Sequence, residues 1–376
     1  MTDKYLLEPD IEFIKEIKGL GGDSLKKCFQ CATCAVTCPI SPDNKPFPRK
    51  EMIAASWGLK DRLVGNVDIW LCHQCGDCST TCPRGAKPGD VLGAIRSYAI
   101  SDYASPKILG KMVNSSSSLL ALLGIPAVIF VILGLITGLF HFSPEPGEII
   151  HAKMFDPLLV QIIFPILMIF MLVVFGRGLK KFLNDIHQEA VNTGKTDKKL
   201  DIGGVIGGLF KILPTILKHD KFSECSENKD RAIAHLMVFY SFIGLFIVTS
   251  IFFVALDFLH LPGPYSQMNP VKWLANICGV MLIVGSGLMI KNRLGKEDQQ
   301  TSYKDWYLLI IVCGLGVTGM LAEITRLLNI ASLSYISYFL HLILVFNLIA
   351  FLPFSKLAHI VYRTVAMAYA EYIDRR

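Results

Sequence analysis

Eight cysteines near the start of the chain have the spacing of iron-sulfur cluster ligands. They form two copies of one pattern, CFQCATCAVTCP and CHQCGDCSTTCP, and each copy follows C-x2-C-x2-C-x3-C-P. In this spacing three close cysteines wrap one face of a [4Fe-4S] cube, and the fourth ligates the other cluster of a pair. The sequence therefore predicts one cluster on Cys28, Cys31, Cys34 and Cys82, and a second on Cys72, Cys75, Cys78 and Cys38.

Structural zinc is the alternative for these thiolates, because paired C-x2-C units also supply four sulfur ligands to zinc. Zinc sites require neither a third cysteine two residues further on nor the x3-C-P ending. A repeated four-cysteine motif is also much rarer by accident than a single one. We therefore favour iron-sulfur clusters.

Two histidines frame the apolar segment HLILVFNLIAFLPFSKLAH, which runs from His341 to His359. If this segment is one helix, the spacing is five whole turns, so both rings project from one face about 27 Å apart. The hydrocarbon core is about 30 Å thick, which places one ring near each membrane surface. A single histidine at a helix end is more often an interfacial residue. Two on one face favour haem ligation, because imidazole is an axial ligand and polar groups in membrane helices face the bundle interior.

A polar head and a long apolar remainder must position these residues. The chain has 376 residues, of which 52% are hydrophobic and 18% charged, and its mean hydropathy is +0.47. We predict a mainly α protein, with a helical two-cluster ferredoxin-like domain over residues 1–112 and a six-helix transmembrane cytochrome b bundle over 113–376. The predicted spans are about 119–140, 157–176, 236–259, 273–290, 307–328 and 336–358.

The distribution of Lys and Arg predicts the orientation of the chain. The segment of about 177–234, between spans two and three, carries eleven of them, whereas 141–156 carries one and 260–271 none. By the positive-inside rule this loop is cytoplasmic, and with six spans so are both termini. The first residues contain no pattern of a signal peptide. We therefore expect a multi-pass protein of the inner membrane whose cysteines lie in a reducing compartment, and the basic loops imply no nucleic-acid partner.

The head resembles the iron-sulfur C subunit of heterodisulfide reductases. The resemblance covers roughly residues 10–105 and rests on both cysteine motifs and on the intervening FPRKEMIAASWGLKDRL, which we expect to form a short helix. It implies a small, mostly helical electron-transfer module with two clusters.

The membrane part resembles the cytochrome b subunit of respiratory nitrate reductases and the E subunit of heterodisulfide reductase. The resemblance covers about residues 157–365 and is strongest in HLILVFNLIAFLPFSKLAHI. It implies a haem b held by His235 and His359, with His341 as a possible ligand of a second haem. In that family the partner of His341 would stand at position 245, which is Leu245 here. His260, His141 and His151 are the possible replacements.

The fusion of these two parts resembles a subunit family of quinone-interacting membrane-bound oxidoreductases. This resemblance implies soluble partner subunits that carry flavin and iron-sulfur groups, menaquinone as the membrane redox partner, and a link to adenylylsulfate reductase. The chain would then be an electron-transfer subunit of a quinone-dependent oxidoreductase, and not a complete enzyme alone. The alternative is a heterodisulfide-reductase-like fusion that serves another thiol/disulfide or flavoprotein partner.

Ionisable residues at the external helix ends are the candidates for a quinone or proton path, because charge in apolar surroundings usually has a purpose or a partner. They are Asp257, His260, Glu323 and Arg326. Glu323 and Arg326 are three residues apart, so a simple ion pair is the alternative for both. A transporter or a zinc-bearing membrane scaffold stays open as another class, and the eight-cysteine pattern argues against both.

Overall fold

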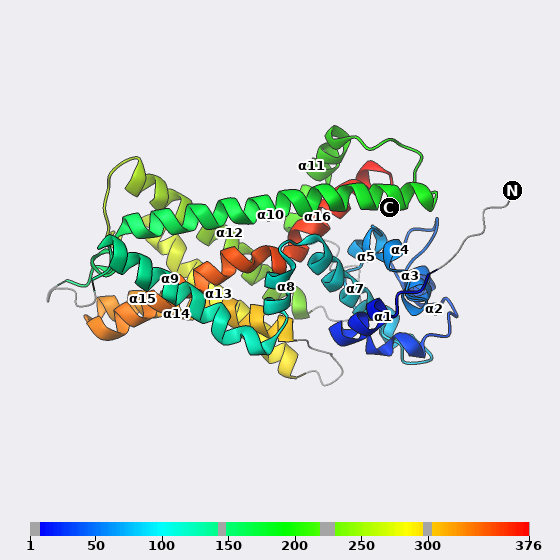
Figure 1. Ribbon diagram of the computed structural model, residues 1–376, viewed down its shortest axis with the longest axis horizontal. Coiled ribbons are helices and arrows are strands. Elements are labelled where there is room, and N and C mark those ends of the chain that lie inside the picture. Colours follow the sequence, from blue (N-terminus) through cyan, green and yellow to red (C-terminus); the bar gives the residue numbers. More distant parts are fainter. Residues whose placement is uncertain (1–7, 142–147, 219–229, 296–302, 376) are drawn as a thin grey trace.

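A computed structural model describes residues 8–141, 148–218, 230–295 and 303–375 of the chain. The structure is 76% helical, and its described residues contain no strand. Figure 1 shows a small head at one end, a bundle of long helices at the other, and one helix, α10, that runs along both. The predicted mainly α fold is therefore confirmed.

The head consists of short helices wrapped around one longer helix. Their bounds are α1 (Ile11–Ile17), the π-helical η1 (Lys18–Gly22), the 3-10 turn η2 (Asp23–Lys27), α2 (Thr33–Thr37), α3 (Arg49–Ser56), α4 (Lys60–Val64), α5 (Asp68–Leu71), α6 (Asp77–Thr80), α7 (Pro88–Tyr103) and α8 (Lys107–Val113). The α7 helix is the centre of the head, and Val91, Ile95 and Ala99 on it are fully buried.

The segment between the cysteine motifs forms two helices, so the expected single helix is only partly right. Gly58 separates α3 from α4 with a φ of +68°, a conformation that glycine adopts without strain. A Cβ at this position would meet the backbone oxygen of Asp10 at 2.7 Å. Close approach of the first helix to this turn therefore requires a residue without a side chain.

Six helices of the structure are long and apolar enough to cross a membrane, which confirms the predicted number of spans. They correspond to α9 (Leu119–Thr137), α10 (Pro157–Asn192), α12 (Asp230–Asp257), α13 (Pro270–Leu294), α14 (Tyr303–Leu327) and α15 (Ala331–Phe351). Two short 3-10 turns, η3 (Ser116–Ser118) and η4 (His151–Lys153), precede α9 and α10. Large apolar side chains such as Leu120 and Phe246 are exposed on them. Apolar exposure of this kind is typical of helices whose outer face meets lipid.

The second span continues well beyond its predicted end. The sequence predicts a loop from about 177, but α10 is helical to Asn192 because its inner face stays apolar: Phe182, Ile186 and Ala190 are fully buried against the head. The run GGVIGGLFKILPTIL, within the stretch predicted as a loop, forms the helix α11 (Ile202–Lys218).

The last predicted span is not one helix, and this prediction was wrong. After α15 ends at Phe351, residues Leu352–Phe354 form a 3-10 turn, η6, and Ser355 is extended with φ −89° and ψ 171°. The final helix, α16 (Ala358–Tyr372), begins after this break. Pro353 explains the interruption, since proline lacks an N–H and its ring clashes with the carbonyl four residues earlier. His341 and His359 thus lie on two helices, and the five-turn argument for one shared face fails.

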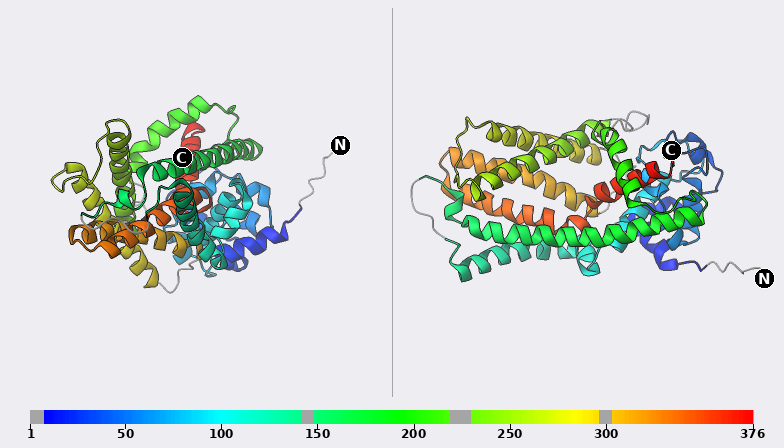
Figure 2. Two further views of the ribbon diagram at one scale, coloured as in Figure 1. Left: turned by 60° about the vertical axis from the view of Figure 1, so that its left-hand side comes forward. Right: turned by 90° about the horizontal axis from the view of Figure 1, so that it is seen from above.

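The α16 helix leaves the bundle and packs on the head. Figures 1 and 2 show it between α11 and the head, and it contacts α11, α10, α5 and α7. Tyr362 on α16 stacks on Trp70 of α5 with ring centroids 5.8 Å apart. The head, the end of α10 and the final helix therefore share one apolar core.

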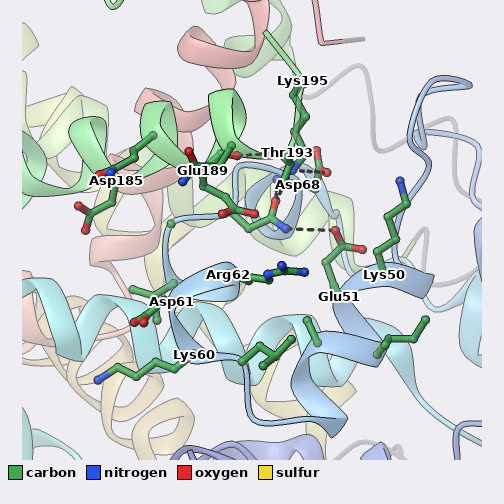
Figure 3. Close-up of a pocket in the computed structure, with 18 of the residues that line it drawn as sticks. Lys50, Glu51, Lys60, Asp61, Arg62, Asp68, Asp185, Glu189, Thr193 and Lys195 are labelled. Atoms are coloured by element: carbon green, nitrogen blue, oxygen red, sulfur yellow. Dashed lines mark hydrogen bonds and ion pairs between the residues drawn. The ribbon is translucent and has the colours of Figure 1, made fainter. Parts of the chain in front are cut away.

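Buried ion pairs close the junction between the head and the end of α10. Asp68 on α5 pairs with Lys195 Nζ at 3.0 Å and with Arg375 Nη2 at 2.8 Å. Beside them lies a cavity of about 1080 Å³ whose lining includes Glu51, Asp61 and Lys195. Figure 3 shows charged side chains of the head and of α10 around this cavity.

Candidate functional site

The two cysteine motifs repeat in structure as they do in sequence. Gln30 and Gln74 both have positive φ, 60° and 52°. Their backbone N–H groups donate to the Sγ atoms of Cys28 and Cys72, both at 3.4 Å. The residues before α2 and α6 are both left-handed. Each motif thus forms the same turn around its first three cysteines.

The thiols of the two motifs fall into two sets of electrostatic neighbours, although within the described residues no three of them stand as a ready-made metal-binding group. Cys34 has Cys28, Cys31 and Cys82 as charged neighbours. Cys38, in contrast, neighbours Cys72 and Cys75. Cys78 neighbours those two cysteines and Cys38. The fourth cysteine of each motif therefore joins the first three of the other.

Burial favours the neutral form of three of these thiols, Cys34, Cys38 and Cys78, by raising their pKa. Burial, and then the charge of neighbouring cysteines, raises the pKa of Cys34 to about 11. Burial likewise raises the pKa of Cys38 to about 11. Thiolates are the ligands of iron-sulfur clusters, so cluster assembly would have to displace these protons.

His235 and His359, the predicted haem ligands, line one cavity. His235 lies in the first turns of α12 and His359 in the first turn of α16, and both helices begin next to the head. The end of α11 closes the cavity with Thr215 and Ile216. The full lining is His73, Thr215, Ile216, His235, Phe239, His359, Ile360, Arg363, Thr364 and Met367.

The break before α16 fixes the orientation of the His359 ring. Its Nδ1 donates to the backbone carbonyl of Lys356 at 2.6 Å, inside the break. This hydrogen bond assigns the proton to Nδ1 and leaves Nε2 as the atom that can bind a metal. Ligating histidines are typically held by such a bond from the second ring nitrogen.

Two imidazoles with apolar side chains from three helices form a donor set of the kind that could bind a haem iron. The enclosed volume is about 100 Å³, which is less than a drug-sized ligand occupies. Phe239 and Met367 are the large, half-buried lining side chains that would have to move to admit a macrocycle.

His73 and Arg363 also belong to this cavity, and the sequence did not predict them. His73 lies between the cluster cysteines Cys72 and Cys75. Arg363 Nη2 donates to His73 Nδ1 at 2.7 Å, and Arg363 is one helical turn after His359. No local signal in the sequence links the two segments, and only the fold shows that they meet.

His341 lies midway along α15 and faces Thr318 and Gly319 of α14. The Thr318 hydroxyl donates to the Gly314 carbonyl at 2.7 Å, so it accepts from His341 Nδ1 at 3.1 Å. A Cβ at Gly319 would lie 3.1 Å from the His341 ring, so glycine makes room for it. Leu245, where the haem partner was expected, packs among apolar side chains of the bundle.

The other external candidates divide into a connected group and isolated residues. Glu323 pairs with Arg326 at 3.1 Å, as the sequence suggested, and with Lys272 at 2.8 Å. His151 lies close to this group and to His341, and burial followed by the Arg326 charge lowers the pKa of His151 to about 4. Its ring stacks on Tyr338 with centroids 4.6 Å apart.

The structure does not bring Asp257, His260 or His141 into that group. Asp257 is the last residue of α12 and its Oδ2 has no hydrogen-bond partner among the described residues. His260 is exposed beyond the helix end, with φ +52°. His141 is also exposed.

Comparison with known proteins identifies the head but not the whole chain. Residues 24–86 match the family of 4Fe-4S dicluster domains. The chain is 42% identical over 91 residues to the C subunit of the H(2):CoB-CoM heterodisulfide,ferredoxin reductase of Methanothermobacter marburgensis, a match over 24% of this chain and 49% of that protein. The counterpart from Methanothermobacter thermautotrophicus matches to the same extent. A protein of Archaeoglobus profundus, described as similar to the C subunit of heterodisulfide reductase, is 36% identical over 89 residues, which are 23% of this chain and 47% of that protein.

The chain thus spans about half the length of these relatives, and all three matches are short. A search of solved structures finds no match. The comparisons support an iron-sulfur electron-transfer domain in the head and favour clusters over structural zinc.

Proposed function

We propose that this chain is a membrane redox subunit that moves electrons between menaquinone and soluble partner subunits, through a haem b and two [4Fe-4S] clusters. The single observation that carries the proposal is the cavity in which His235 of α12 and His359 of α16 meet His73 of the second cysteine motif. A membrane helix, the final helix and a cluster motif share this one site.

The residues divide the work by position. Cys28, Cys31, Cys34 and Cys82 would hold one cluster, and Cys72, Cys75, Cys78 and Cys38 the other. His235 and His359 would hold the haem iron, with the Lys356 carbonyl orienting the His359 ring. When bound, these groups accept one electron each, which allows the two electrons of a quinol to be separated.

The second cysteine motif is joined to the final helix. Its His73 is joined to Arg363 of α16 at 2.7 Å, and the buried Arg96 of α7 donates to the Cys72 carbonyl at 2.7 Å. These contacts fix the second motif against the proposed haem site. We infer the order quinone, haem, second cluster, first cluster.

The external group is our proposed quinone site. His341 has its Nδ1 proton committed to Thr318, so Nε2 is left to accept a hydrogen bond from a quinol hydroxyl. Glu323 and His151 nearby provide titratable groups for proton release. In this arrangement the head and both termini face the cytoplasm, as the positive-inside rule predicts.

The partners follow from the resemblance of the two fused parts. We propose soluble subunits with flavin and iron-sulfur groups, and a functional link to adenylylsulfate reductase. The alternative, a heterodisulfide-reductase-like fusion with a thiol/disulfide partner, gains support from the relatives of the head. Reduction of the purified protein by a menaquinol analogue supports the quinone-dependent subunit. Re-oxidation of its clusters by a disulfide substrate, but not by adenylylsulfate reductase, supports the heterodisulfide-reductase-like fusion.

Haem content per polypeptide tests the proposal, measured on the full-length protein beside non-haem iron and acid-labile sulfide. We expect haem in the native protein, its loss in His235→Ala and His359→Ala, and unchanged iron and sulfide in both. His187→Ala is the matched control, since His187 lies on α10 with its Nδ1 on Tyr369. Haem retained in His359→Ala would refute this ligand pair. Haem that is present in the native protein but lost in His341→Ala would instead assign the haem to His341.

A further inference from the structure

The internal repeat of the head allows the two cysteine groups to be compared position by position. The second group faces inward, since Cys72 and Cys78 are buried, while in the first group Cys31 is exposed. The second motif is the one that contacts the final helix, through His73 and Arg363, while the first motif keeps an exposed cysteine.

Equivalent positions of the two motifs have opposite surroundings. His73, the residue after the first cysteine of the second motif, is engaged by Arg363 of α16. Phe29 holds the same position in the first motif and is 68% exposed. The Arg84 guanidinium lies over the Phe29 ring at 4.0 Å from its centroid. A large apolar ring thus occupies, on the outer motif, the position through which the inner motif contacts its redox neighbour.

A second exposed apolar side chain belongs to the same motif. Val36 on α2 is 86% exposed, while its equivalent in the second motif is the polar Thr80. Exposed apolar and aromatic side chains next to arginine are typical of the centre of a protein interface.

Charge around these side chains has one predominant sign. Lys26 and Lys27 directly precede Cys28 and are exposed, and Arg84 is exposed two residues after Cys82. Asp23 is the acidic residue of the same stretch. We define the outer face of the head by Lys26, Lys27, Phe29, Val36 and Arg84. This face attracts an acidic surface, and complementary charge mainly raises the rate of association.

We propose that the outer face of the head docks an acidic soluble redox protein, which exchanges electrons with the cluster on Cys28, Cys31, Cys34 and Cys82. The inference rests on the proposed function and names the surface and the charge of the partner. When bound by its four cysteines, the first cluster would give one electron to the partner's redox centre or accept one from it.

A stopped-flow experiment on the full-length protein with its clusters tests this proposal. The probe is an acidic two-cluster ferredoxin in catalytic amount, kept reduced by excess NADPH and a ferredoxin reductase, so that the bleaching followed is that of the protein's own clusters. The test variant is Phe29→Ala with Lys26→Glu and Lys27→Glu. Lys199→Glu is the matched control, because Lys199 is an exposed lysine in the connection between α10 and α11, outside this face. Small-molecule reduction by dithionite checks that the clusters of each variant are intact.

We expect the second-order rate with ferredoxin to fall roughly tenfold or more at low salt in the test variant, and to lose its salt dependence. The rate with dithionite and the Lys199→Glu rates should match the native protein. An unchanged ferredoxin rate with normal dithionite bleaching would overturn the proposal that this face docks the partner. A change of the oligomeric state in the test variant, with an unchanged ferredoxin rate, would overturn it as well. Because the readout is cluster bleaching, absence of haem would contradict the proposed function while the docking result stands by itself.

Discussion

Glu51 makes the stability of the head depend on pH. The side chain is 2% exposed on α3 and accepts one hydrogen bond, from Asn66 Nδ2 at 3.2 Å, while its Oε2 has no partner among the described residues. Burial, and then the charge of Asp68, raises its pKa from 4.5 to about 7. Figure 3 shows this carboxylate at the junction of the head with α10. We predict that Glu51→Gln stabilises the protein above neutral pH.

The size and sign follow from linkage. A carboxyl whose pKa is higher in the folded state binds more protons there, so stability is fully present below the unfolded pKa of 4.5 and is lost as pH rises through about 7. Each pKa unit corresponds to about 1.4 kcal/mol, so the total loss is roughly 3 kcal/mol. The amide that replaces the carboxyl in the variant carries no proton to lose. The two proteins should differ by less than about 1 kcal/mol at pH 5 and by roughly 3 kcal/mol at pH 8.

Urea unfolding in detergent between pH 5 and pH 8 measures this difference, with tryptophan emission as the probe because Trp70 is fully buried in the head. With an m-value of about 1–3 kcal/mol per molar urea, the midpoint of Glu51→Gln should rise by roughly 1–3 M at pH 8. Asp61→Asn removes an exposed carboxylate from the same cavity and serves as the control. A difference that is constant with pH, or that shrinks as pH rises, would refute a buried carboxyl with a raised pKa.

Three further substitutions test the remaining contacts. Asp68→Asn leaves two buried cations without their carboxylate and should cost roughly 3–5 kcal/mol, measured by the same urea midpoints; a cost under about 1 kcal/mol would contradict burial of the pair. Arg363→Gln removes the contact to His73 and should slow electron equilibration between haem and clusters in stopped-flow spectra, with haem and iron contents unchanged. Equal rates would exclude this contact from the route. Thr318→Val removes the acceptor of the His341 Nδ1 proton and should raise the KM for a quinol with little change in kcat; loss of haem instead would identify His341 as a ligand.

Local spacing predicted the cysteine groups because the chain itself imposes their geometry. Three cysteines within seven residues can only wrap one centre, and the x3-C-P ending carries the fourth away toward the other motif. In the structure Cys82 is an electrostatic neighbour of Cys34, and Cys72 of Cys38, which agrees with this grouping, while the assignment of the cluster ligands stays a prediction. The number of spans was equally accessible, since apolar length alone indicates it.

The prediction of one continuous last span from helical periodicity was wrong because of a single proline. The segment from His341 to His359 is apolar and keeps a helical spacing, but Pro353 removes a backbone donor in its middle. The signal was visible in the sequence as LPFS, and the regular spacing of the two histidines outweighed it. The contact of Arg363 with His73 had no local signal, because 290 residues separate the two in the chain.

The break between α15 and α16 determines where the final helix packs. A continuous helix would carry His359 along the axis of α15, whereas the turn at Leu352–Phe354 lets α16 lie across the head, with Tyr362 on Trp70 and Arg363 on His73. The same turn supplies the Lys356 carbonyl that orients His359. A substitution that restored the helix, such as Pro353→Ala, would therefore be expected to disturb the ring of His359 and the seating of the head together. The position of the second cysteine group is therefore coupled to that of His235 and His359, because α16 carries both His359 and the Arg363 contact to His73.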